Sequence, residues 1–256
     1  MKFDLTRPNS GRMIDYWLGG SHNFEIDRQM ADQVAGRFPI IKHIIPESRT
    51  LVRRGVQYFR AHGISAILDL GAGLPTCDNT HLVAHALDPK IKVVYSDIDP
   101  ITVAYGQELL QDTPNAIYLQ CDAANPQTVL DSAAVLQFLG DERRVGIIFL
   151  NLAHAMSDDQ IRASWGSLYE WAASGSFLFV SNASEKWNTD PELIAVREVY
   201  GRANLTGYFR SPDEIRALAH PWRETPEGIV NQPSWYNPQP PVALGQVLGY
   251  ASMLYK

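Results

Sequence analysis

Glycine and aspartate residues follow successive apolar segments of this sequence at spacings that suit a ligand site. The first segment, residues 66–70, runs into Gly71 and Gly73, and glycines there let the backbone approach a ligand closely. The next two segments end in Asp97 and Asp122. A carboxylate at the second position can hold both ribose hydroxyls of an adenosyl ligand, and one at the third can accept from the adenine amine. Together the three segments predict one ligand crevice.

The glycine pattern favours one kind of adenosyl ligand. A dinucleotide-binding turn has the form G-x-G-x-x-G/A, but here the third position is Thr76 and Pro75 precedes it. A Walker-type phosphate loop is excluded because no GxxxxGK[ST] pattern occurs. A ligand without phosphates, S-adenosylmethionine, therefore fits better than NAD.

Short apolar segments alternate with helical patterns through most of the chain. This alternation predicts an α/β fold with a doubly wound, mostly parallel sheet. The expected strands are residues 66–70, 91–96, 116–120, 145–150 and 176–181. Helix start signals occur at Asn125-Pro126, Ser157, Asp190-Pro191 and Ser211-Pro212.

Both ends of the chain depart from this alternation. Residues 1–62 hold a glycine-rich turn and two helical patterns, over 25–37 and 46–62, which predict a helical N-terminal cap. Residues 225–241 are rich in proline, and 242–255 have strand character. We expect a single domain, residues 1–256, in which the cap covers a Rossmann-like core of residues 63–256.

Composition sets the broad class of the protein. The chain has 256 residues, of which 45% are hydrophobic and 20% charged, as in globular proteins. A net charge of −6 argues against a nucleic-acid partner. Cys77 and Cys121 form neither a disulfide framework nor a zinc-ligand pattern, so we expect free thiols and no metal. No apolar run resembles a signal peptide or a membrane span, which predicts a cytoplasmic protein.

Three motifs resemble those of a known class of enzymes. ILDLGAGLPT, VVYSDIDP and YLQCDAANP are similar to the first three motifs of class I S-adenosylmethionine-dependent methyltransferases. From about residue 7 to 255 the chain resembles one bacterial family of that class, formerly catalogued as a domain of unknown function. Its most specific part is DYWLGG-x-x-NF near the N-terminus, which generic methyltransferases lack.

The resemblance implies a Rossmann-like sheet with an antiparallel last strand and S-adenosylmethionine as cofactor. The methionine portion is expected along the glycine turn, the ribose at Asp97, and the adenine at Asp122 and Ala123. Asn151 would lie near the transferred methyl group, although similar families carry a more apolar segment there, which leaves its role open. The implied cofactor-binding residues are Asp69, Gly71, Ala72, Gly73, Asp97, Ile98, Asp122, Ala123 and Asn151.

Candidate bases are few, because methyl transfer needs a base only when the acceptor must lose a proton. His154, just after the fourth strand, is the best placed, and Tyr16 and His22 in the cap follow. A purely structural role is the alternative for His154 and for Tyr16. His154 can be a buried residue or can cap the following helix, and Tyr16 can belong to the core of the N-terminal cap. Asp99 is likewise an alternative to Asp97 for the ribose, and Asp122 can cap a helix.

Two further features each allow two interpretations, and a third allows one. Gly19-Gly20 suits an ordinary turn or a lid beside the crevice. Trp222, Trp235 and Tyr236 either line the substrate pocket or pack beneath the tail. A helix bearing four arginines predicts a solvated face. These arginines are Arg49, Arg53, Arg54 and Arg60.

The sequence thus predicts S-adenosylmethionine-dependent methyl transfer to an unidentified small-molecule acceptor. One alternative is a module that binds this cofactor without catalysis. The other is an NAD-dependent oxidoreductase on a similar sheet, against which the glycine turn argues. The oligomeric state is left open.

Overall fold

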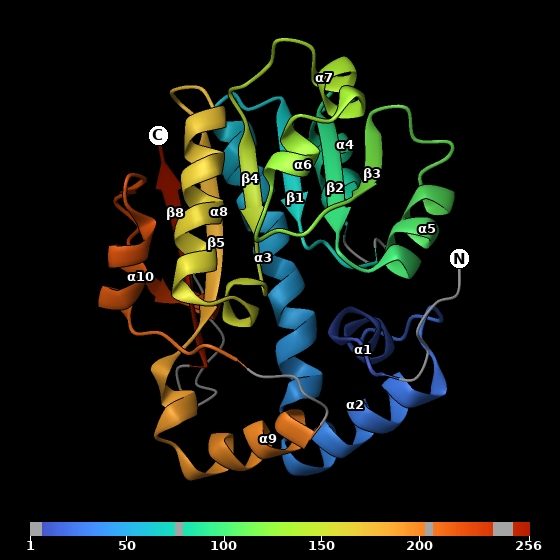
Figure 1. Ribbon diagram of the computed structural model, residues 1–256, viewed down its shortest axis with the longest axis vertical. Coiled ribbons are helices and arrows are strands. Elements are labelled where there is room, and N and C mark those ends of the chain that lie inside the picture. Colours follow the sequence, from blue (N-terminus) through green and yellow to red (C-terminus); the bar gives the residue numbers. More distant parts are fainter. Residues whose placement is uncertain (1–6, 75–78, 203–206, 238–247) are drawn as a thin grey trace.

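A single twisted sheet forms the centre of the molecule (Figure 1). The computed structural model describes residues 7–74, 79–202, 207–237 and 248–256. The sheet order is β3-β2-β1-β4-β5-β8-β6, and β7 pairs with β8. Strands β1 to β5 pair in parallel, while β8 runs antiparallel to β5, which confirms the predicted fold class. The strands are β1 (Ala66–Leu70), β2 (Lys92–Asp97), β3 (Ala116–Gln120), β4 (Gly146–Phe149), β5 (Phe177–Ala183), β6 (Arg223–Glu224), β7 (Val230–Asn231) and β8 (Gly249–Tyr255).

Helices cover both faces of the sheet and bury two apolar clusters. Successive residues of β1 point to opposite faces, so Ile67 belongs to one cluster and Leu68 to the other. On the Ile67 face lie α3 (Ile41–Ala61), α4 (Thr80–Leu87) and α5 (Pro100–Leu109). On the Leu68 face lie α6 (Gln127–Leu130), α7 (Ala133–Leu139), α8 (Asp158–Trp171) and α10 (Pro212–Ala219). Among the described residues, no helix has the length and apolar character that a bilayer span requires.

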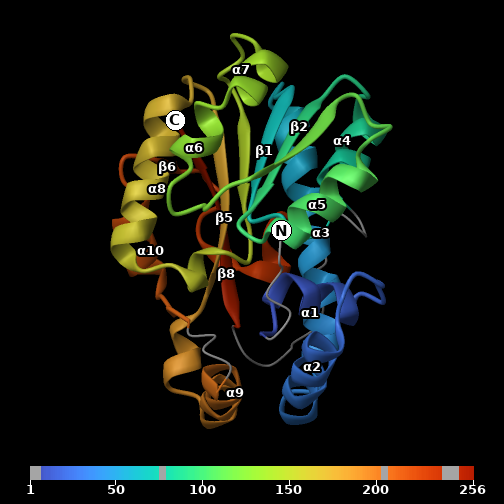
Figure 2. The same ribbon diagram turned by 45° about the vertical axis from the view of Figure 1, so that its right-hand side comes forward.

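A third apolar cluster lies beyond the carboxyl ends of the parallel strands (Figures 1 and 2). It is built by α1 (Ser10–Trp17), α2 (Glu25–Arg37), the start of α3 and α9 (Pro191–Arg202). The same α3 continues upward onto the sheet, where Phe59 packs against Gly146 of β4. The N-terminal helices therefore share their core with a helix from far along the chain.

Several element boundaries differ from the prediction. The helix predicted over 46–62 begins at Ile41, with Pro46 inside it, because burial of Ile41 and Ile45 stabilises the extra turns. Helix α1 was not predicted. Asn125 does not cap a helix, since α6 begins only after Pro126.

Other start signals are confirmed. Ser157 and Ser211 form capping boxes, and the Asp190 carboxylate accepts a hydrogen bond from the backbone N–H of Glu192 at 2.9 Å. Helix α2 spans the predicted residues 25–37. Residues 242–247 of the predicted last strand lie outside the described part of the chain.

The turn of the DYWLGG-x-x-NF motif is held by a buried carboxylate. Asp15 accepts hydrogen bonds from the His22 backbone N–H and the Asn23 amide, both at 2.9 Å. A side chain at Gly20 would overlap the Asp15 carboxylate, and Gly19 has a positive φ of 80°. These contacts make the segment a hydrogen-bonded turn and give a physical reason for its glycines.

Arg12 joins the cap to the sheet. Its guanidinium contacts Asp27 of α2 at 2.8 Å and Asp99, which follows β2, at 3.1 Å. Arg12 is 3% exposed and Asp27 is fully buried. Asp27 also accepts from the backbone N–H groups of Asn9 at 2.8 Å and Phe24 at 2.9 Å. One buried network therefore positions α1, α2 and the end of β2 together.

Candidate functional site

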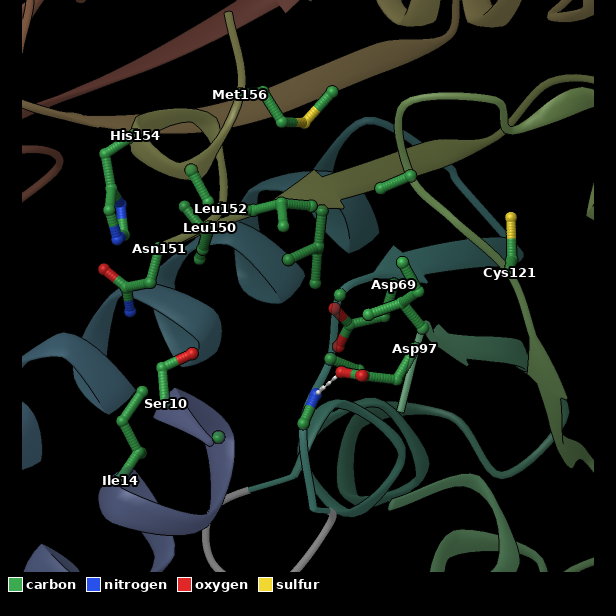
Figure 3. Close-up of a pocket in the computed structure, with 18 of the residues that line it drawn as sticks. Ser10, Ile14, Asp69, Asp97, Cys121, Leu150, Asn151, Leu152, His154 and Met156 are labelled. Atoms are coloured by element: carbon green, nitrogen blue, oxygen red, sulfur yellow. Dashed lines mark hydrogen bonds between the residues drawn. The ribbon is translucent and has the colours of Figure 1, made fainter. Parts of the chain in front are cut away.

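A cavity of about 380 Å³ opens at the carboxyl ends of β1 to β4, against α1 and α3 (Figure 3). All the implied cofactor-binding residues line it, as does His154. Tyr16 and Asp99 are absent from its lining. The lining residues are Asn9, Ser10, Gly11, Ile14, Ser48, Arg49, Val52, Asp69, Gly71, Ala72, Gly73, Asp97, Ile98, Cys121, Asp122, Ala123, Ala124, Ile148, Leu150, Asn151, Leu152, His154, Ala155, Met156 and Gln160.

The glycine turn after β1 forms one wall of the cavity. Gly73 has a φ of 64°, and a Cβ built there meets nothing within 4 Å, so the turn borders open space. Its N–H donates to the Asp97 carboxylate at 3.0 Å. Its carbonyl accepts from the Tyr118 hydroxyl at 2.7 Å. The backbone is thus fixed on both sides and leaves room for a ligand where a side chain would stand.

The acidic residues after β2 have separate roles. Asp97 lines the cavity and accepts from the backbone N–H of Asp99 at 2.9 Å. Burial raises the pKa of Asp97, and the two N–H donors oppose this shift. Asp99 caps α5 and pairs with Arg12. Of the two alternatives for a ribose, Asp97 is therefore the one that faces the cavity.

Asp69 is the most deeply placed carboxylate of the lining. It is 7% exposed and accepts from the Thr80 hydroxyl at 2.6 Å. Burial raises its pKa to about 6, against the lowering effects of Thr80 and the nearby Arg49 charge. A bound cation would compensate the buried charge that the fold leaves there.

The end of β3 provides a wall of mixed polarity. The exposed Asp122 accepts from the backbone N–H of Ala124 at 2.9 Å, as in an Asx turn. The Ala123 carbonyl accepts from Ser164 at 2.6 Å, which fixes the backbone. Ile98, which follows β2, is 59% exposed although it is apolar. Ile98 and Asp122 both line the cavity, where they offer an apolar contact and a hydrogen-bond acceptor.

Cys121 also lines the cavity, as a buried free thiol. Burial raises its pKa, so the thiol is protonated at neutral pH. Cys77 lies outside the described residues.

Asn151 and His154 stand at the end of β4, above Ser10 and Ile14 of α1 in Figure 3. Asn151 has a φ of 53°, a conformation that asparagine tolerates better than most residues. Its N–H donates to the Ser181 hydroxyl at 2.7 Å. Burial, helped by the Arg210 charge, lowers the pKa of His154 to about 4, so its imidazole is neutral at physiological pH.

Arg210 shapes the segment that carries His154. It donates to the carbonyls of Ala153 at 2.8 Å and Met156 at 2.6 Å, the first residue of the 3₁₀ turn η1 (Ala153–Ala155) and the residue after it. It also pairs with Asp158 at 2.9 Å. A nearly buried cation therefore fixes this wall.

The other candidate bases lie away from the cavity. The Tyr16 hydroxyl contacts the Asp32 carboxylate at 3.3 Å, which raises the pKa of Tyr16. His22 packs edge-on against Tyr105, with ring centroids 4.9 Å apart. The cap instead contributes Gly11, whose Cβ position would lie 3.8 Å from the Gly73 Cα atom. This close approach closes the cavity at α1.

Helix α3 corrects the interpretation of its arginines as a solvated face. Arg53 and Arg60 are exposed, but Arg49 lines the cavity. Arg54 donates to the backbone carbonyls of Pro233 at 3.0 Å and Trp235 at 2.7 Å. Arg49 precedes Val52 by three residues, which puts it on the inward face of the helix.

The tryptophans support packing rather than a substrate pocket. Trp222 is buried and donates from its indole N–H to the Trp165 carbonyl at 2.9 Å. Trp235 is fully buried, with its ring centroid 4.2 Å from that of Phe179. Neither residue lines the cavity, and both belong to the apolar clusters that flank the sheet, which favours a packing role.

The parallel sheet with a reversed last strand and the acidic strand ends around one cavity define a Rossmann-like methyltransferase fold. The family model described as S-adenosyl methyltransferase matches residues 1–253, and the chain belongs to this family. It is an S-adenosylmethionine-dependent methyltransferase.

Solved structures agree with this assignment. A candidate methyltransferase from Thermobifida fusca is 31% identical with a TM-score of 0.90, over 99% of this chain and 96% of that one. A DUF574 family protein from Streptomyces avermitilis is 25% identical with a TM-score of 0.91, over 100% of both chains. Human N-acetylserotonin methyltransferase, solved with S-adenosylmethionine, shares only the fold, at 13% identity, a TM-score of 0.51 and coverage of 98% of this chain and 63% of that one. No curated protein matches the sequence.

Proposed function

We propose that the cavity binds S-adenosylmethionine and that the enzyme methylates a small molecule held between α1 and the segment after β4. The observation that supports this proposal is the convergence of the glycine turn with Asp69, Asp97 and Asp122 around one cavity. The open space beside Gly73 and the exposed apolar side chain of Ile98 fit an adenosyl ligand with a cationic amino-acid portion.

Each wall has a distinct task. The glycine turn and Asp69 hold the amino-acid portion, and Asp97 accepts hydrogen bonds from the ribose hydroxyls. Ile98 and Ala123 flank the adenine, and Asp122 accepts from its amine. When bound, the cofactor supplies a methyl group already activated on a sulfonium. The remaining task of the chain is to align the acceptor and exclude water.

Asn151 and His154 are the polar groups beside the space for an acceptor. A neutral imidazole with a pKa of about 4 is a weak base but a competent hydrogen-bond acceptor. We infer that His154 orients the acceptor by accepting its O–H or N–H proton in a hydrogen bond. Tyr16, which lies outside the lining, takes no part in this proposal.

The cavity size and the cap favour a compact acceptor. About 380 Å³ must hold the cofactor and the reacting part of the acceptor together. In this proposal residues 1–62 form the cap of a single domain whose core is residues 63–256. The net charge of −6 argues against a nucleic-acid acceptor.

Titration calorimetry with S-adenosylmethionine, S-adenosylhomocysteine and NAD tests the ligand. We expect the two sulfur-containing ligands to bind and Asp97→Asn to weaken them at least about tenfold, because a charged hydrogen-bond acceptor is lost. Asp159→Asn, at an exposed position of α8, is the matched control and leaves affinity unchanged. Preferential binding of NAD, or binding of none of the three, would contradict the proposal.

Cofactor affinity should also depend on pH. A cationic ligand binds more tightly when Asp69 is ionised. The pKa of Asp69 is about 6 in the free enzyme, so Asp69 becomes protonated when the pH falls below about 6. The dissociation constant should therefore rise as the pH falls through about 6, by at most about tenfold per pH unit. Calorimetry between pH 8 and pH 5 measures this effect. An equal affinity at both ends of the range would show that Asp69 does not contact the cationic portion.

A further inference from the structure

The charges of the cavity lining are unbalanced. Asp69, Asp97 and Asp122 line it, whereas Arg49 is the only lysine or arginine among the described lining residues. Arg49 comes from the helix α3, whereas the three aspartates come from the strand ends. The proposed ligand carries a carboxylate in addition to its cationic groups, and the three acidic side chains repel that carboxylate.

The position of Arg49 is fixed by the helix. Ser48, Arg49 and Val52 all face the cavity from the middle of α3. Arg49 and Asp69 line the same cavity, and the Arg49 charge opposes the burial that raises the pKa of Asp69. Gly71 follows Asp69 by two residues and also lines the cavity. The negative charge of Asp69 and the positive charge of Arg49 therefore both lie at the cavity wall that the glycine turn forms.

This charge pair matches an amino-acid zwitterion. An α-amino-acid group has an ammonium and a carboxylate on one carbon, and recognition of both needs one anion and one cation close together. The guanidinium is the side chain best suited to a carboxylate, because it can donate two parallel hydrogen bonds. Resting on the proposed function, we propose that Arg49 is the specificity-determining residue that binds the α-carboxylate of the amino-acid portion.

The competing role for Arg49 is purely structural. In that case it would offset the buried charge of Asp69 and maintain the shape of the cavity. Its replacement would then weaken all adenosyl ligands alike. The two roles are separated by a ligand that lacks only the carboxylate, namely decarboxylated S-adenosylmethionine.

Titration calorimetry compares S-adenosylmethionine with its decarboxylated form on four proteins: wild type, Arg49→Gln, Arg49→Lys and Arg53→Gln. We expect wild type to prefer the carboxylate-bearing ligand at least about tenfold, and Arg49→Gln to abolish most of this preference. Its affinity for the decarboxylated ligand should change less than about threefold, and Arg49→Lys should retain part of the preference. Arg53→Gln, on the exposed face of the same helix, should behave as wild type.

The outcomes separate the inference from the proposed function. Equal weakening of both ligands by Arg49→Gln, or a wild type without preference, overturns the role of Arg49 while the cofactor site stands. Binding of neither ligand to wild type overturns the proposed function and the inference with it. Thermal unfolding checks that each variant folds. If Arg49→Gln does not, the wild-type preference and Arg49→Lys decide the question.

Discussion

Replacement of Arg12 by methionine is expected to lower the free energy of unfolding by about 3–5 kcal/mol, as when one partner of a buried ion pair is removed. The fully buried Asp27 would lose its only described cationic partner and keep two backbone N–H donors. Asp99 would lose the same guanidinium at the start of α5. Methionine retains most of the side-chain volume of arginine, so the decrease in the free energy of unfolding reflects mainly the lost charge. Denaturant unfolding of wild type and variant measures it.

The matched control is Arg162→Met. Arg162 also pairs with an aspartate, Asp159, but both side chains are largely exposed. Exposed pairs contribute about 0–1 kcal/mol, so this variant should unfold close to wild type. If the two variants were equally stable, the network around Arg12 would not hold the cap to the sheet.

Asp69→Asn is expected to stabilise the free enzyme and at the same time to weaken the cofactor. The pKa of Asp69 is about 6 in the folded protein and about 3.9 in an unfolded chain, so its charge disfavours folding above that range. With about 1.4 kcal/mol for each pKa unit, removal of the charge should add about 2–3 kcal/mol at pH 8. Asparagine can still accept from Thr80. Calorimetry should show at least about tenfold weaker S-adenosylmethionine binding.

The pH dependence tests the cause of this stabilisation. As the pH falls from 6 toward 4, Asp69 becomes protonated in the folded wild type, so the advantage of asparagine should shrink to less than about half of its value at pH 8. Thermal unfolding at pH 8 and pH 4.5 provides the comparison, with Asp159→Asn as an exposed control. A gain that is equal at both pH values would mean that packing, rather than charge, is responsible.

The strand ends of the site could be predicted because their placement is topological. A parallel sheet brings the residues after β1, β2, β3 and β4 to one edge, so the positions of Gly71, Asp97, Asp122 and Asn151 followed from the order of the segments. The periodicity of short apolar runs was enough to find these strands. The prediction that these residues meet at one edge of the sheet needed no knowledge of side-chain geometry.

The helical side of the site was harder to predict. Helix α1 has only eight residues, too few for a clear period, although Asn9 accepts from the Arg12 backbone N–H as a capping residue does. Arg49 was assigned to solvent because four arginines on one helix are typical of a solvated face. Its spacing to Ile45 and Val52 would have placed it on the inward face.

Pro46 misplaced the start of α3 for a related reason. Proline is most frequent in the first turn of a helix, so the prediction began there. The helix continues through it because Ile41 and Ile45 pack against α2 and α9, and that burial offsets the lost hydrogen bond. Tertiary contacts of this kind cannot be derived from local sequence.

The cluster shared by the N-terminal helices and α9 restricts how such enzymes can diverge by recombination. Leu193, Val196 and Val199 of α9 are buried against the first helices, so a graft of residues 1–62 from a relative would meet a foreign surface on α9. The unit of exchange is therefore two segments separated by more than a hundred residues. A chimera designed to transplant acceptor choice must carry both segments, and a natural crossover between them must keep their packing compatible.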